Sequence, residues 1–382
     1  MLKTARTNVV KRSSCGVRRI LSLLKVLSQQ AAIGGQAVME GVMMRSPGFW
    51  AVAVRRFDGS IVEVVREHDS VARRHAWARL PLIRGMVALY ESLRIGFRAL
   101  SVSAHFAAEA IDAEVAHRDE GAPVDDTAST GAAASDSVVH LPETEAVGSD
   151  ANPDSISGWQ IAIAFIIAFG FSIALFKVAP VLLTKWVGVP GKSFTFVLVE
   201  SAIRISVFIG YLALVGLMPD MRRVFQFHSA EHKAINAWEQ GVSLEPHLVN
   251  QQSRIHVRCG TAFMLWVFVV AIFVFGLYGY LFQPSTTELV LSRILLLPVI
   301  TGMSFELIRF AGKYPNNRML RAVLAPGLWM QYLTTRPCDG DQCAVAIASL
   351  RAVLTREYPD SSVEEALLEL VDGGSENLEI MA

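Results

Sequence analysis

Hydrophobic positions gather in four long runs between residues 159 and 308, and the segments around them are ordinarily polar. The runs are Trp159–Thr184, Phe194–Met218, Gly260–Phe282 and Leu289–Ile308. A helix needs about 20 mostly apolar residues to cross a bilayer, and long uncharged runs are rare in soluble cores. The pattern therefore predicts an α-helical multi-pass membrane protein with about four transmembrane helices, in contact with the lipid bilayer.

A pattern of shorter period precedes these runs and predicts a small β region over residues 31–75. Ala51–Phe57 and Ser60–Val65 contain β-branched residues, and Asp58-Gly59 lies between them. Asp and Gly both tolerate a positive φ, so this arrangement predicts a β-hairpin. The segment Gln36–Met44 adds a third predicted strand.

The next two segments differ sharply in composition. Residues 76–111 have the spacing of an amphipathic helix whose apolar face is interrupted by arginines. Such a helix either lies in the membrane interface or packs against the membrane domain. Residues 112–157 hold eleven acidic residues and one basic residue, Arg118. They cannot bury enough apolar area to offset the cost of ordering, so we expect a disordered acidic linker.

Basic residues are distributed unevenly around the membrane domain, which is predicted over residues 158–312. The loop 219–259 and the segment 313–382 are rich in them, and the loop 283–288 has none. The positive-inside rule then places both termini and the loop 219–259 in the cytoplasm. Residues 1–30 have seven basic residues and no acidic one, which fits a basic segment at a membrane surface or a targeting segment. In the C-terminal segment, helices are predicted over Leu320–Leu333, with a break at Pro326-Gly327, and over 341–357.

The strongest candidate for chemistry is the sequence H-S-A-E-H at 228–232, within a helical pattern over 222–240. His228 and His232 are four residues apart, so they lie on one helix face and can share a divalent metal, with zinc as the expected ion. Glu231 is placed to take a proton from metal-bound water, as in the inverted zinc-protease motif. Two ordinary histidines on a surface helix are the alternative interpretation.

Four further residues are candidate ligands for the same metal. Glu239 lies two turns beyond His232 on one helix face. His256 and Cys259 are three residues apart where the loop enters the third apolar run, and Glu306 lies near the inner end of the fourth. The alternatives are a basic membrane edge with a small buried cysteine, and a glutamate held at the interface.

Other polar residues are weaker candidates. Glu200 and Arg204 can pair within the second run, where ionisable groups are costly and often mark functional interiors. Glu40 either pairs with Arg45 or faces the cytoplasmic site. The spacing of Cys338 and Cys343 is poor for zinc. The four cysteines are too few for a disulfide framework, and a net charge of zero gives no general field for nucleic acid.

Six blocks of sequence closely resemble the YqhQ-like bacterial membrane proteins. They are G-G-Q-A-V-M-E-G-V-M-M-R at 34–45, R-G-M-V-A-L-Y-E-S-L at 84–93, F-H-S-A-E-H-K-A at 227–234, R-I-H-V-R-C-G-T at 254–261, F-E-L-I-R-F-A-G-K at 305–313 and P-G-L-W-M-Q-Y-L-T-T-R at 326–336. The resemblance spans residues 31 to 355 apart from the acidic linker. It implies a multi-pass protein of the bacterial inner membrane and a predicted metal-dependent enzyme, without a substrate. Cys343 departs from the acidic residue expected in such relatives, which weakens a metal site at Cys338 and Cys343.

Two functions remain open on the sequence. The first is a metal-dependent hydrolase in which Glu231 takes a proton from water activated by a metal at His228 and His232. The second is a membrane protein without catalysis, an assembly factor or a carrier whose path includes Glu200, Arg204 and Glu306. Stoichiometric metal that depends on both histidines would favour the first.

Overall fold

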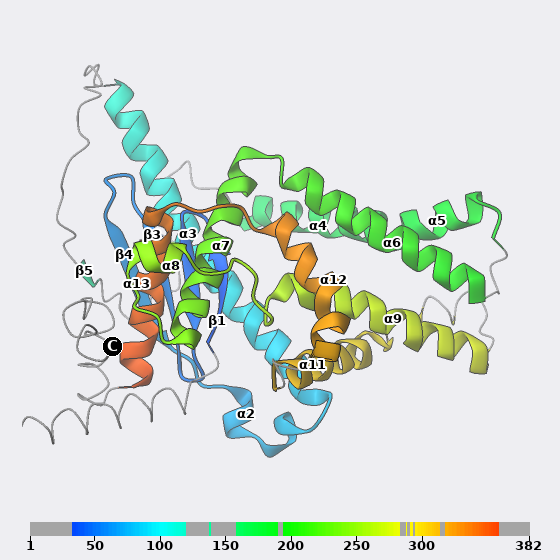
Figure 1. Cartoon of the computed structure of the whole chain (residues 1–382). Coiled ribbons are helices and arrows are strands. Elements are labelled where there is room, and N and C mark those ends of the chain that lie inside the picture. The colour runs from blue at the N-terminus through cyan, green and yellow to red at the C-terminus, as the bar shows by residue number, and fades with distance from the viewer. Residues whose placement is uncertain are drawn as a thin grey trace, which may run out of the picture.

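The structure is a computed structural model that describes residues 33–119, 137–138, 158–189, 194–282, 288, 291–292, 295–313 and 318–358. The basic segment 1–30 and most of the acidic segment lie outside these residues. A sheet covered by helices forms one part of the molecule, at the left of Figure 1, and long apolar helices extend from it to the right. The structure is mostly helical, with a small N-terminal antiparallel sheet.

The sheet has the order β1-β2-β3-β4-β5. β1 (Gly34–Val38), β2 (Gly41–Arg45), β3 (Phe49–Arg55) and β4 (Ile61–Glu67) are antiparallel neighbours, and β5 (Ser137–Val138) adds in parallel to β4. The predicted hairpin is confirmed as β3 and β4. Its loop covers residues 56–60. Of the predicted turn residues Asp58 and Gly59, only Gly59 has a positive φ, of 82°. Asp58 instead accepts a hydrogen bond from the Ser60 N–H at 2.9 Å.

The predicted third strand is in fact two strands, β1 and β2, joined at Met39 and Glu40. Glu40 adopts a left-handed φ of 52°, which lets the chain reverse within two residues. The Gly-rich sequence before the turn therefore forms the outermost strand of the sheet.

Both faces of the sheet are covered. α7 (Pro219–Gln240) and α13 (Gly340–Glu357) pack on one face, and α3 (Ile83–Asp119) packs on the other. Side chains alternate between the faces with period two. Those on the first face are Val42, Met44, Ala51 and Ala53, and those on the second are Val38, Met43, Val52, Val54, Val62 and Val64. Double burial explains why the strands read as nearly continuous apolar runs.

The helix predicted over 76–111 is interrupted at its start and longer at its end. α2 (Val71–Arg74) and the 3₁₀ helix η1 (Ala76–Arg79) come first, and α3 then runs to Asp119, into the segment predicted to be a disordered linker. Gly85 of α3 and Gly302 of α11 sit at a close helix contact, where an added Cβ would come within 2.7 Å of a neighbour in either case. α3 therefore packs against the apolar helices as well as on the sheet.

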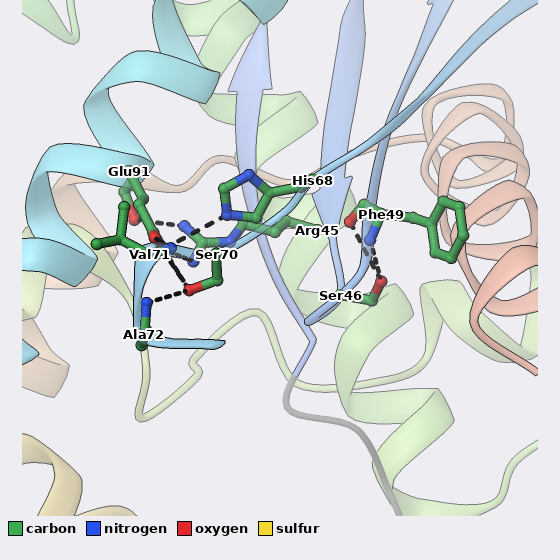
Figure 2. A network of polar contacts seen from close by, with 9 residues as sticks. Arg45, Ser46, Phe49, His68, Ser70, Val71, Ala72 and Glu91 are labelled. Atoms are coloured by element: carbon green, nitrogen blue, oxygen red, sulfur yellow. Dashed lines mark hydrogen bonds and ion pairs between the residues drawn. The ribbon is translucent and has the colours of Figure 1, made fainter. Parts of the chain in front are cut away.

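A buried carboxylate ties α3 to the start of α2 and to the sheet (Figure 2). Glu91 is 4% exposed and accepts hydrogen bonds from the Val71 N–H at 2.7 Å and the Ser70 hydroxyl at 2.9 Å. Arg45 forms an ion pair with it at 3.3 Å, and the His68 ring lies 3.4 Å away. Arg45 therefore pairs with Glu91 and not with Glu40.

Within the residues that the structure describes, three helices are long and apolar enough to cross a membrane, and they cover Ile166–Trp186, Thr195–Val215 and Gly260–Phe282. The first is a continuous helix built from α4 (Gly158–Ile173), a π-helical turn, η2 (Ala174–Val178), and α5 (Ala179–Trp186). The π turn ends two residues before Pro180, which lacks the N–H that a regular helix would use. The other two are α6 (Phe194–Val215) and α9 (Gly260–Phe282). Large apolar side chains on these helices are exposed in the isolated chain, as expected of a surface that faces lipid.

The region of the predicted fourth span holds α11 (Leu297–Lys313), which is not among the three candidates. Its 17 residues give a length of about 25 Å, shorter than a typical bilayer core. α12 (Arg318–Thr334) follows and runs through Pro326 without ending, so the predicted break there is wrong. Gly327 faces Ala262 and Trp266 of α9, at a distance where an added Cβ would make ordinary contact.

Candidate metal centre

The H-x-x-E-H sequence lies on α7, as the sequence predicts. Pro219 begins the helix, where its missing N–H costs nothing, and Asp220 in the first turn suits the positive helix end. Gly241 ends the helix in the left-handed conformation, with φ 67°. The apolar side chains of α7 pack on the sheet and α13, so Glu231 and His232 are buried at 4% and 1% exposure.

Side chains of α7 hold the following loop against the helix. Lys233 donates through Nζ to the carbonyl of Asn250, the last residue of α8 (Pro246–Asn250), at 2.8 Å. Asn236 donates through Nδ2 to the carbonyls of Ser253 at 2.7 Å and Ile255 at 3.1 Å. These bonds return the chain to α7 just before α9 begins, and they bring Cys259 next to the histidines.

Backbone carbonyls orient both histidine rings. His228 Nδ1 lies 2.8 Å from the carbonyl oxygen of Thr334, and His232 Nδ1 lies 2.7 Å from that of Arg254. A carbonyl can only accept, so Nδ1 of each ring carries the proton and donates it. In a neutral ring, Nε2 is then left with its lone pair available. Metal-binding histidines are commonly held in this way.

Three ligand atoms converge at this point. One donor atom from each of His228, His232 and Cys259 lies within 4.8 Å of the other two, and these three residues are the metal-competent group found among the described residues. Cys259 Sγ is 3.4 Å from His228 Nε2, and the two imidazole centroids are 4.4 Å apart. Two imidazole nitrogens and one thiolate form a donor set that suits zinc.

The ionisable groups of this cluster change one another's pKa values. Burial lowers the pKa of His228, but the charges of Cys259 and Glu231 and the hydrogen bonds to Cys259 and Thr334 together raise that pKa to about 9. Burial likewise opposes ionisation of Cys259, yet His228 and His232 together bring the thiol pKa well below its usual value. The two shifts favour a Cys259 thiolate beside a protonated His228, so a metal bound there would displace the proton from His228 Nε2.

Glu231 lies between the histidines and the edge of the sheet. Burial raises the pKa of its carboxyl group, and the positive charges of His228 and His232 oppose that increase. The carboxylate lies against Gly35 of β1, where a Cβ would stand 2.8 Å from Glu231 Oε1. Gly35 itself is exposed, so the buried carboxylate lies next to a surface-accessible strand.

His256 and Glu239 lie beside the three-residue cluster. The His256 ring centroid is 5.8 Å from that of His232, and its Nε2 lies 3.3 Å from Glu239 Oε2. Arg258 also forms an ion pair with Glu239. The Gln331 side chain accepts from the His256 N–H at 2.9 Å and donates to its carbonyl at 2.7 Å. These residues support the loop and place a second carboxylate near the cluster.

Glu306 and Glu40 have other partners. Glu306 forms an ion pair with Arg84 of α3, and it is not part of the metal-competent group. Glu40 accepts a hydrogen bond from Arg223 Nη2 at 2.7 Å. Arg223 precedes His228 by more than one turn of α7. Glu200 and Arg204 pair with each other in the buried part of α6. Cys338 and Cys343 lie side by side with their sulfurs 3.6 Å apart, and they are not part of the metal-competent group.

Several residues that shape the site were not predicted individually, namely Gly35, Arg254, Gln331 and Thr334. Each of them lies in one of the sequence blocks at 34–45, 254–261 and 326–336. Together with the block at 227–234, these blocks meet around the cluster. Backbone carbonyls and a glycine carry no side-chain signal, so only their position within long motifs could have pointed to them.

The comparisons with known proteins agree with these motifs. The model of the family "Protein of unknown function (DUF1385)" matches residues 80–356. The chain is also 30% identical over 331 residues to "Uncharacterized protein YqhQ" of Bacillus subtilis (strain 168), covering 85% of this chain and 93% of that protein. No solved structure matches. The chain therefore belongs to the DUF1385 family.

Proposed function

We propose that this protein is a metal-dependent hydrolase that holds a divalent metal, zinc in the first instance, between His228, His232 and Cys259. One observation carries the proposal. Both Nδ1–H groups are fixed on backbone carbonyls, at 2.8 Å from Thr334 and 2.7 Å from Arg254, so the remaining nitrogens and the Cys259 sulfur can share one ion. Ordinary surface histidines have no need of two matched carbonyl acceptors and a buried thiolate.

Each residue of the site would have its own role in the reaction. A metal at this position lowers the pKa of a bound water toward neutrality. Glu231 is the base that takes the proton of that water, since its carboxylate lies beside both histidines in a buried setting that raises its pKa. Glu239, bonded to His256, is a second carboxylate near the same centre. Glu306 has no part in this proposal because Arg84 holds it elsewhere.

We further propose how the chain sits in the membrane. α9 begins at Gly260, directly after Cys259, so the metal centre lies at the membrane surface if α9 is a span. The positive loop 219–259 then places the centre in the cytoplasm of a bacterium, with both termini on that side. This topology needs a fourth crossing in the region of α11, helped by tilt or by residues before Leu297.

Labelling of engineered cysteines in intact cells tests the orientation. Val187 follows α5 and is 60% exposed, whereas His247 of α8 has a side chain 66% exposed. A membrane-impermeant maleimide should react with Val187→Cys and spare His247→Cys. Labelling of His247→Cys alone would invert the topology.

Metal analysis tests the function. The full-length protein purified in detergent should hold about one zinc per chain, and a His228→Ala/His232→Ala variant should hold almost none. His247→Ala is the matched control, because this exposed histidine pairs with Glu245 and should leave the metal content unchanged. Equal metal in the double variant and the control would remove the basis of the proposal.

A second candidate function uses the same residues without a metal. The 3.4 Å contact between Cys259 Sγ and His228 Nε2, with a thiolate on Cys259, is also the arrangement of a cysteine nucleophile and its base. A chelator and an alkylating agent separate the two. Hydrolysis abolished by the chelator and restored by zinc belongs to the metal enzyme, whereas hydrolysis that survives chelation and is lost on alkylation belongs to a cysteine enzyme.

The non-catalytic alternative, an assembly factor or carrier, stays a prediction of the sequence. Its candidate charges are neutralised locally, Glu200 by Arg204 and Glu306 by Arg84. Local pairing of this kind stabilises helix packing and does not by itself point to a path for a solute.

A further inference from the structure

We propose that the substrate of this site is a polypeptide segment that binds in extended conformation along the outer edge of β1. The inference rests on the proposed hydrolase function and adds the class of substrate. It starts from the position of β1, which ends the sheet order, and from its contact with Glu231.

The register of the hairpin fixes which backbone groups of β1 face outward. Val38 and Gly41 are paired across a two-residue turn, so they exchange both hydrogen bonds directly. The pattern alternates along the ladder, so Gln36 bonds to Met43, while the N–H and C=O groups of Gly35 and Ala37 point away from β2. The Met44 N–H agrees with this, because it bonds to Ser349 and not to its cross-strand neighbour Gly35.

Within the described part of the chain, no strand pairs with the outer edge of β1. Donors and acceptors on an open edge match the backbone of another strand, and proteins commonly bind extended peptides by adding them to such an edge. Neighbouring strands lie about 4.8 Å apart. An added segment would therefore pass directly beside Gly35 and the carboxylate behind it.

Gly35 lies between the open edge of β1 and the proposed base, Glu231. It is exposed on the edge, and a Cβ added to it would stand only 2.8 Å from Glu231 Oε1, so no side chain fits between this strand and the carboxylate. A peptide bond held at Gly35 would thus lie next to the base and the two histidines. Figure 1 shows that β1 is the side of the sheet nearest the apolar helices, so the segment would be met at the membrane surface.

The reaction at such a bond balances without a further reactant. Water adds to the carbonyl carbon, the C–N bond breaks, and Glu231 carries the proton from the water to the leaving amine. The products are a carboxylate and an amine, so the only substrates are the peptide and water.

The test uses the full-length, zinc-loaded protein in detergent micelles. The probe is a mixture of proteome-derived peptides with blocked amines, in which each cleavage creates a new N-terminus that mass spectrometry detects. We expect new N-termini from the wild-type protein and none from Glu231→Gln. A cleaved peptide is then resynthesised with single backbone N-methyl groups. If the peptide binds as an added strand, only every second N–H bonds to β1. Cleavage should therefore tolerate an N-methyl group at alternate positions and be lost when the methyl group is at the others.

A variant of the edge provides a second readout. Ala37→Pro removes one outward N–H while leaving the bonds to β2 intact, a substitution that edge strands accept. It should lower peptide cleavage about tenfold, the worth of one hydrogen bond to a substrate, with unchanged zinc. Ala37→Ser keeps the N–H and should cleave like the wild type.

The outcomes distinguish a failure of the peptide-binding inference from a failure of the proposed hydrolase function. Zinc-loaded protein that hydrolyses p-nitrophenyl acetate through Glu231 but gives no new peptide N-termini would overturn the peptide substrate and keep the hydrolase. Cleavage without period-two sensitivity to N-methylation, or equal cleavage by Ala37→Pro and Ala37→Ser, would overturn binding along β1. Protein that binds no zinc would overturn the hydrolase itself.

Discussion

Two buried carboxylates lie on helices that pack against opposite faces of the same sheet, and their surroundings differ. Glu91 on α3 is surrounded by donors: the Ser70 hydroxyl, the Val71 N–H and the Arg45 guanidinium (Figure 2). Glu231 on α7 is as deeply buried, at 4% exposure for each residue, but it faces imidazole rings and an exposed strand. Equal burial therefore accompanies two different surroundings.

The contrast separates a carboxylate that is fixed by hydrogen-bond donors from the carboxylate that we propose to be reactive. A carboxylate whose oxygens accept several hydrogen bonds is stabilised as an anion and fixed in place. Burial beside titratable groups instead raises the pKa of Glu231, which suits a residue that must gain and lose a proton. Substitutions at the two positions should therefore separate stability from reactivity.

The largest expected effect is on catalysis at α7. Glu231→Gln should keep zinc but lower hydrolysis about 10²–10⁴-fold, because glutamine fills the same space and cannot take a proton. His228→Ala should lose both zinc and hydrolysis, since it removes a ligand. Zinc content and peptide cleavage of the two variants check this. Full activity in Glu231→Gln would exclude the general-base role.

A smaller effect, on stability alone, is expected at α3. Glu91→Ala leaves the Arg45, Ser70 and Val71 donors without their acceptor and should lower the free energy of unfolding by about 3 kcal/mol. Zinc content should not change. Thermal unfolding in detergent measures the loss, with Asp69→Ala as control, because its ion pair with Arg74 is largely exposed. A loss of zinc in Glu91→Ala would show that the two carboxylates are not independent.

The smallest substitution tests the contact between β1 and Glu231. Gly35→Ala places a Cβ 2.7 Å from the Met43 carbonyl oxygen and 2.8 Å from Glu231 Oε1, so the strand or the carboxylate must move. We expect a loss of about 1–3 kcal/mol in stability together with reduced hydrolysis. Gly34→Ala meets nothing within 4 Å and is the matched control. Identical behaviour of the two variants would mean that Glu231 does not depend on Gly35.

The sequence predicts the parts of this comparison that local patterns encode. Period-two positions and Gly59 mark the β3–β4 hairpin, long apolar runs mark the spans, and the i, i+4 histidines mark one face of α7. It does not predict that Glu40 allows a two-residue reversal and makes β1 an edge strand. Nor does it show α12 continuing through Pro326, since the packing of α12 against α9 is a tertiary effect.

The sequence singles out the side chains that cluster at the candidate site, but not the groups that support them. His228, His232, Glu231 and Cys259 come together, and His256 lies beside them with Glu239. Glu306 is placed elsewhere because its partner, Arg84, is more than two hundred residues away in the sequence, a pairing that spacing cannot reveal. The carbonyls of Thr334 and Arg254 belong to every residue alike, so no residue type marks them.

The most direct test of the account is the ligand set of the metal. Zinc K-edge X-ray absorption, with elemental analysis, should be measured on the full-length protein purified in detergent. The account predicts about one zinc per chain, with one sulfur ligand at about 2.3 Å and imidazole nitrogens at about 2.0–2.1 Å, and loss of the sulfur in Cys259→Ser. A protein without stoichiometric metal, or a shell of nitrogen and oxygen alone in the wild type, would contradict it.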